Sequence, residues 1–132
     1  MLQFNDYYRL LFSANEQLKK SNFDVWYLNA TSILEAKGIL MYTQSDVIAI
    51  VKAGIQAGSN TSEDLQNAMM VDSKARAFLL TSISMEIKVK VKNLKTAYAM
   101  MTKIKEFYDH EKTKGIDHYV RKIKLLEGKE HK

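Results

Sequence analysis

Cysteine is absent from the sequence, and its absence excludes whole classes of structure. The chain can form no disulfide bond, and it can build no zinc centre that depends on thiolate ligands. No apolar run approaches the roughly eighteen residues that a membrane-spanning helix needs. The N-terminus also lacks the basic region and cleavage site of a signal peptide. We therefore expect a cytoplasmic protein that makes no contact with a membrane.

Proline is absent too, and glycine occurs only five times. Proline is most costly inside helices, so a chain without it suits an all-α fold. Four of the glycines fall where helical patterns break, at Gly38, Gly54, Gly58 and Gly115. Because 132 residues, 46% of them hydrophobic, suffice for one core, we expect a single domain over residues 1–132. We expect it to be a compact bundle of about five to seven helices.

Residues suited to catalysis and metal binding are also sparse. The only histidines are His110, His118 and His131, all in the C-terminal third. Acidic neighbours could complete an imidazole–carboxylate zinc site there, but exposed polar residues around a turn at Gly115 are the ordinary explanation. No glycine-rich phosphate-binding loop is present. We expect no enzymatic activity, no cofactor, no metal and no small-molecule substrate.

Positive charge is concentrated at one end of the chain. Residues 1–85 carry seven Lys and Arg against eight Asp and Glu, a net charge of −1, whereas residues 86–132 carry thirteen against seven, a net charge of +6. We take two basic groups as candidate nucleic-acid contacts. The first is Lys88, Lys90, Lys92 and Lys95, and the second is Lys112, Lys114, Arg121, Lys122 and Lys124.

These lysines have two interpretations. Contacts from lysine to phosphate would give salt-sensitive RNA binding without sequence preference. The alternative is a solvated face that keeps a basic protein soluble. Lysine outnumbers arginine seventeen to three, which argues against bidentate recognition of bases. A sequence-specific DNA-binding domain is therefore the least favoured class.

Hydrophobic periodicity predicts helices along most of the chain. The clearest begins after Ser21, which with Asp24 resembles a capping box, and ends at Gly38. A later helix lies within residues 93–112, with Asn93 and Thr96 as its candidate caps and an apolar stripe from Leu94 to Tyr108. Another helix follows Gly115. The side chains that we take as core anchors lie on the first two of these helices: Phe23, Trp26, Ala97, Ile104 and Tyr108.

The segment between these helices is less regular. Residues 47–55 are so densely apolar that they indicate a short buried helix, with a strand as the alternative. Thr61 and Asp64 then begin a long helix, whose apolar stripe includes Asp72 and Arg76. The two polar residues indicate that the middle of the stripe is less buried than its ends.

The adjacent methionines, Met69 with Met70 and Met100 with Met101, have two interpretations. We expect each pair to contribute one buried and one half-exposed side chain to the core. The alternative is an adaptable groove for a partner.

The stretch "SISMEIKVKVKN" alternates strictly between apolar and polar residues from Ile83 to Val91. Alternation is typical of a half-buried strand, but only residues 47–51 offer a doubtful partner strand. In a helix, Ile87, Val91 and Leu94 share one face and only Val89 is misplaced. We therefore predict a short helix.

The N-terminal segment "FNDYYRLLF" combines aromatic and aliphatic side chains and would leave apolar surface exposed if it did not pack. We predict a helix within residues 1–21. Either it closes the core of its own chain or it contacts a neighbouring subunit. In the second case the candidate self-association residues are Phe4, Tyr7, Tyr8 and Leu11.

Three clusters in residues 22–127 together resemble the Gag polyprotein of copia-type LTR retrotransposons. The first is "NFDVWYLNATSILEAKGIL", with Phe23 and Trp26 at the aromatic positions of the family. The second is "DSKARAFLLTSISMEIKVKV", in which Asp72, Ala75, Leu79, Ser82 and Ile83 match. The third is Thr96 and Ala97, followed by Met100, Ile104 and Tyr108. Met101 departs from the pattern, because the family often has Trp there.

The resemblance implies a fold like the N-terminal domain of a retroviral capsid and a structural function. The expected partners are further copies of the chain, or full-length Gag, in an assembly that holds RNA. The chain would be the first half of a capsid, either a piece of a longer protein or a domesticated remnant. The alternative function is a domesticated helical binding module that tethers a partner or interferes with capsid assembly.

Overall fold

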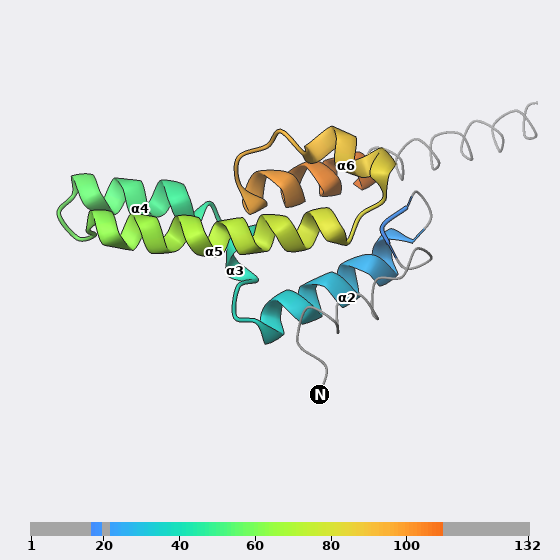
Figure 1. The fold of residues 1–132 in the computed structure, drawn as a ribbon, viewed down its shortest axis with the longest axis horizontal. Helices are drawn as coiled ribbons and strands as arrows, with labels where there is room; N and C mark the ends of the chain where they lie inside the picture. The colour runs from blue at the N-terminus through green and yellow to red at the C-terminus, as the bar shows by residue number, and fades with distance from the viewer. Residues whose placement is uncertain (1–16, 20–21, 110–132) are drawn as a thin grey trace, which may run out of the picture.

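The computed structural model describes residues 17–19 and 22–109, and every regular element in this part of the chain is a helix (Figure 1). The prediction of an all-α bundle is confirmed. The helix predicted after Gly115 lies outside the described residues, as does most of the helix predicted within residues 1–21. Residues 17–19 are described and are not helical, because Leu18 pairs with Ile83 in a bridge. The described helices are α2 (Phe23–Ala36), α3 (Met41–Gln44), α4 (Val47–Gln56), α5 (Ser62–Thr81), α6 (Met85–Val91) and residues 97–109.

The predicted capping box would make Ser21 the N-cap of α2. The N-cap is Asn22 instead, so the helix begins one residue later. The Asn22 side chain holds the preceding turn instead, accepting a hydrogen bond from the Lys19 N–H at 2.7 Å and donating one to the Gln17 carbonyl at 2.8 Å. The predicted end at Gly38 is confirmed. Gly38 has a φ of +74°, and the Ile39 N–H reaches back to the Leu34 carbonyl at 3.0 Å, as in a Schellman turn.

The dense apolar segment at residues 47–55 is helical, since α4 covers it and no residue there is in a strand. Asp46 caps α4 by accepting a hydrogen bond from the Ala49 N–H at 3.2 Å. The expectation that this helix is buried is wrong, because none of its residues is buried. Helix α4 packs along the N-terminal half of α5, and in Figure 1 this pair extends away from the other described helices.

Helix α5 begins with the predicted capping box between Thr61 and Asp64 and is the longest described helix, at 20 residues. Figure 1 shows α2 on one side of its C-terminal half, with α6 and helical residues 97–109 on the other. The buried core is shared by all four of these segments. Its largest fully buried members include Trp26, Leu34, Leu79, Met100, Met101, Ile104 and Val91.

The alternating stretch proves to be mainly helical. Only Ile83 pairs as a strand residue, in a short parallel bridge with Leu18, and α6 begins two residues later. Ile87 and Val91 face the core, so the predicted helix is confirmed. The expectation that only Val89 is misplaced is wrong, because Met85 is exposed as well. No helix in residues 17–19 and 22–109 is long and apolar enough to span a membrane.

Candidate interaction surfaces

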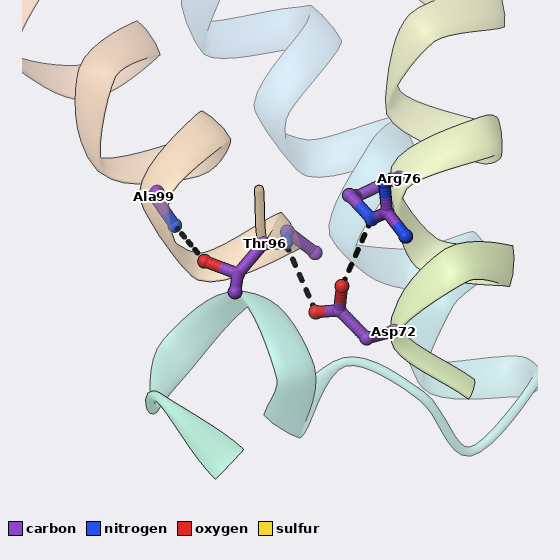
Figure 2. Close-up of polar contacts among 5 residues, drawn as sticks. Asp72, Arg76, Thr96 and Ala99 are labelled. Atoms are coloured by element: carbon purple, nitrogen blue, oxygen red, sulfur yellow. Dashed lines mark hydrogen bonds and ion pairs between the residues drawn. The ribbon is translucent and has the colours of Figure 1, made fainter. Parts of the chain in front are cut away.

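The Asp72 carboxylate makes polar contacts with two partners within the described core. Asp72 lies in the middle of α5 with only 3% of its surface exposed, so the expectation that this part of the stripe is less buried is wrong. Figure 2 shows its two oxygens pointing to different partners. Oδ1 accepts a hydrogen bond from the Ala97 N–H at 3.0 Å, and Oδ2 pairs with Arg76 Nε at 2.9 Å.

This carboxylate acts as a cap on a helix that is distant in sequence. Thr96 Oγ1 accepts a hydrogen bond from the Ala99 N–H at 3.1 Å, as the sequence predicts, while Asp72 satisfies the N–H of Ala97 (Figure 2). A negative charge is also favourable at the positive end of a helix dipole. Asp72 therefore fixes the start of helical residues 97–109 against α5, and its role is structural.

Large apolar side chains are exposed on every numbered helix of the described chain, and the pair formed by α4 and α5 carries three of them. Ile50, Met69 and Met70 are 61%, 53% and 63% exposed, and we call these three the hairpin surface. The expectation for the methionine pairs is therefore wrong in both cases. Met69 and Met70 are both exposed, and Met100 and Met101 are both fully buried.

A second exposed apolar surface lies on α6. Met85 is 70% exposed and Val89 is 57% exposed, and they are four residues apart on one helix face. Lys88 and Lys92 flank them on the same side of the helix. We call Met85, Lys88, Val89 and Lys92 the α6 surface.

The helical conformation of α6 separates the first basic group. Residues two apart in a helix differ in direction by about 200°, so Lys90 does not share a face with Lys88 and Lys92. The Lys90 ammonium lies 3.8 Å from the centroid of the Phe107 ring, a cation–π contact within the protein. Lys95 is exposed in the loop that follows α6. The second basic group lies outside the described part of the chain: Lys112, Lys114, Arg121, Lys122 and Lys124.

An aromatic column joins α2 to helical residues 97–109. The Phe23 ring stacks on Tyr108 with centroids 4.6 Å apart and on Tyr27 at 5.5 Å. Phe107 meets Tyr108 edge-to-face at 5.3 Å, and the Lys105 ammonium lies 5.2 Å from the Tyr27 ring centroid. These rings pack against one another, and their role in the described structure is to hold the two helices together.

Tyr108 closes this column at its buried end. Its hydroxyl donates a hydrogen bond to the Lys19 carbonyl, which ties the helix to the chain before α2. Burial raises the pKa of the Tyr108 phenol to about 12, with a smaller contribution from the negative charge of Glu86. The phenol therefore stays protonated, and the hydrogen bond intact, throughout the physiological range.

The predicted core anchors all lie in or against the core. Trp26, Ala97 and Ile104 are buried, as is Tyr108, and Phe23 is half-buried against the core. Phe4, Tyr7, Tyr8 and Leu11, proposed for self-association, lie outside the described residues, as do the three histidines. Within residues 17–19 and 22–109, no three His, Cys, Asp or Glu side chains are grouped so that they could hold a metal ion.

Sequence patterns missed two features of these surfaces. A carboxylate within an apolar stripe can indicate a buried helix cap. The sequence therefore held a signal for the burial of Asp72, but we interpreted it as a sign of lower burial. No signal in the sequence indicated the exposure of Ile50, because apolar periodicity alone does not reveal whether a neighbouring element covers a helix.

Comparisons with protein-family models, with curated proteins and with solved structures found no match for this chain. A proposal for its function can therefore be argued only from the sequence and from the described residues.

Proposed function

We propose that this protein is a non-enzymatic, capsid-like structural protein of the cytoplasm that associates with further copies of itself. The observation that carries the proposal is the hairpin surface, where α4 has no buried residue although most of its side chains are apolar. A helical hairpin packed on one side only is half of a four-helix arrangement, and its outer face favours a partner. Burying apolar area contributes about 25 cal/mol per Å².

The resemblance to copia-type Gag supplies the capsid-like character of the proposal. The residues that carry it come together in the core. Trp26 Nε1 donates a hydrogen bond to the Ser82 carbonyl at 2.8 Å, which joins the first cluster to the second. The bond between Asp72 and Ala97 joins the second to the third. These contacts support treating the three clusters as one packing signature.

A weak RNA contact is a subsidiary part of the proposal. It rests on residues 85–95, where four lysines stand against one acid, Glu86. Lys88, Lys92 and Lys95 remain available to phosphate, while Lys90 lies over Phe107. The contact would weaken steeply with salt, by electrostatic release of counterions.

The alternative is a binding module that uses the same apolar surfaces to hold a different protein or full-length Gag. Exposed methionines favour this alternative as well, because their flexible side chains adapt to different partners. A binding module would stay monomeric alone, whereas an assembly protein associates with itself.

The test is the molar mass of the purified protein, measured by light scattering over a hundredfold concentration range at low and high salt. We expect mass to rise with concentration and oligomers to persist at high salt, because apolar contacts are not screened. Replacing Ile50 and Met70 by Glu should return the protein to a monomer. The matched control replaces Val25 and Leu28 by Glu, since both are 65% exposed on α2.

Circular dichroism of each variant excludes unfolding as the cause. A monomer at every wild-type concentration contradicts the proposal and favours the binding module. If Phe4→Asp with Tyr8→Asp abolishes association while I50E/M70E does not, the N-terminal segment is the contact and the hairpin surface is not.

A further inference from the structure

We infer that residues 82–84, the α5–α6 connection, form a binding site for an extended peptide that carries a leucine, and that residues 17–19 of the same chain occupy this site. We call residues 17–19 the strap, and Figure 1 shows it in blue beside the connection. The strap lies in no helix, and it contacts the core as a separate peptide would. The site does not involve the hairpin surface, so it goes beyond the proposed self-association.

The main chain of the strap pairs with the α5–α6 connection as an added strand does. The Leu18 N–H donates a hydrogen bond to the Ser82 carbonyl at 3.0 Å, and the Leu18 carbonyl accepts one from the Ser84 N–H at 3.1 Å. The Lys19 carbonyl accepts a further hydrogen bond from the Tyr108 hydroxyl. Pairing of this kind is how many proteins bind extended peptides, because it recognises the main chain of the ligand whatever its side chains.

The Leu18 side chain supplies the apolar part of the contact. None of its surface is exposed, and it belongs to the same buried cluster as Trp26 and Ile83. The flanking residues are held less closely, since Gln17 is half-buried and Lys19 is exposed. The site therefore selects a leucine at one position and tolerates different polar residues on either side.

The partners of the strap are remote in sequence. The Gln17 side-chain amide donates a hydrogen bond to the Thr81 carbonyl, 64 residues away, and Lys19 is 89 residues from Tyr108. The covalent connection to α2 keeps the strap near the site at an effective concentration on the order of millimolar. An outside peptide therefore competes poorly with it, and the site takes a ligand from elsewhere once the strap leaves.

The experiment expels the strap and supplies its sequence as a separate molecule. Leu18→Asp puts a charge where the described chain buries a leucine, so the strap should leave the site. The probe is a synthetic peptide with the sequence of residues 15–22, NEQLKKSN. Trp26 is the only tryptophan in the chain, and its Nε1 shares the Ser82 carbonyl with the Leu18 N–H, so its fluorescence reports on the site.

We expect the peptide to restore wild-type Trp26 fluorescence to the Leu18→Asp variant and to raise its midpoint of urea denaturation towards that of wild type. Wild type should need at least about a hundredfold more peptide for any response, because its own strap holds the site. The same peptide with Asp in place of its leucine should have no effect on either protein.

Leu28→Asp is the matched control, because Leu28 is 65% exposed on α2 and its replacement leaves the strap in place. This variant should keep wild-type fluorescence and should not respond to the peptide. Leu18→Gly is the second test variant, since it removes the buried side chain without adding a charge. Where either Leu18 variant loses its helical circular dichroism, recovery of the helical signal on adding the peptide replaces fluorescence as the readout.

A further arm identifies the source of an outside ligand. The Leu18→Asp variant is mixed with I50E/M70E protein, which keeps its leucine but should not associate through the hairpin surface. Restored fluorescence in this mixture would indicate that copies exchange their straps, whereas restoration by the peptide alone would assign the site to a segment of another protein. The inference is overturned if the peptide changes neither Leu18 variant, or if the peptide without leucine restores them equally well.

Discussion

At the scale of single residues, the described core depends on a few polar groups whose partners are distant in sequence. Trp26 reaches the carbonyl of Ser82, and Asp72 reaches the N–H of Ala97. Each bond satisfies a buried group that would otherwise lose its contact with water, a loss of about 1–3 kcal/mol. These two hydrogen bonds therefore help to fix how the helices pack together, in addition to the apolar area that the residues bury.

Replacing Asp72 by Ala tests this dependence. The change leaves the buried Ala97 N–H without an acceptor and removes a charge from the helix N-terminus, so we expect the free energy of unfolding to fall by about 2–3 kcal/mol. Asp72→Asn keeps one oxygen for Ala97 and should cost about 1 kcal/mol. Urea denaturation followed by circular dichroism measures both variants.

Asp24 provides the control for the Asp72 variants. It lies exposed in the first turn of α2, so Asp24→Ala should change the free energy of unfolding by no more than about 0.5 kcal/mol. Equal losses for Asp72→Ala and Asp24→Ala would show that the contact with Ala97 carries no special weight.

Sequence patterns predicted which residues lie on helices better than they predicted which residues are buried. The start of α5 at Thr61 and the end of α2 at Gly38 were predictable, because capping depends on neighbours within a few residues. The burial of Asp72 was predicted wrongly, and so was the expectation that one of Met69 and Met70 is buried. Burial depends on which segment folds over a helix face. Local signals contain no information about that segment.

At the scale of elements, α6 shows how a helix can form from an alternating sequence. A strand would have placed all five apolar residues from Ile83 to Val91 on one face. The helix buries Ile87 and Val91 and leaves Met85 and Val89 exposed. The described chain supplies a strand partner only at Leu18, opposite Ile83, so pairing ends there and the helix follows.

Alanine substitutions at Val89 and Val91 distinguish the two conformations in solution. In a strand both side chains would share one environment, but in α6 only Val91 is buried. We expect Val91→Ala to lower the free energy of unfolding by about 2 kcal/mol, because it removes buried methyl groups. Val89→Ala should change it by less than about 0.5 kcal/mol.

Thermal or urea denaturation measures both changes. The two valines are chemically identical and two residues apart, so each is the matched control for the other. Similar losses at both positions would contradict the helical assignment of this stretch.

At the scale of the whole molecule, the described chain divides into a core and a projecting pair of helices. The C-terminal half of α5 packs with α2, α6 and residues 97–109, while its N-terminal half has α4 as its companion (Figure 1). The sequence indicated helices on both sides of this division. It did not indicate the division itself, because α4 is as apolar as a core helix and differs only in having no buried residue.

This division predicts unequal stability along the chain. Helix α4 has no fully buried residue and lies outside the core cluster, so its amides should exchange with solvent through local opening, at free energies at least about 2 kcal/mol below that of global unfolding. Hydrogen exchange followed by mass spectrometry at low concentration measures the difference, with the buried amides of α2 as the internal reference. Equal protection in α4 and α2 of the monomer would contradict it.

The proposed self-association predicts a change in this pattern as the concentration is raised. Binding stabilises whatever it covers by mass action, so α4 should gain protection while α2 keeps its monomer values. The I50E/M70E variant should show the monomer pattern at every concentration. Protection that rises in α2 but not in α4 would contradict a contact through the hairpin, and protection that rises uniformly would indicate global stabilisation without a defined contact.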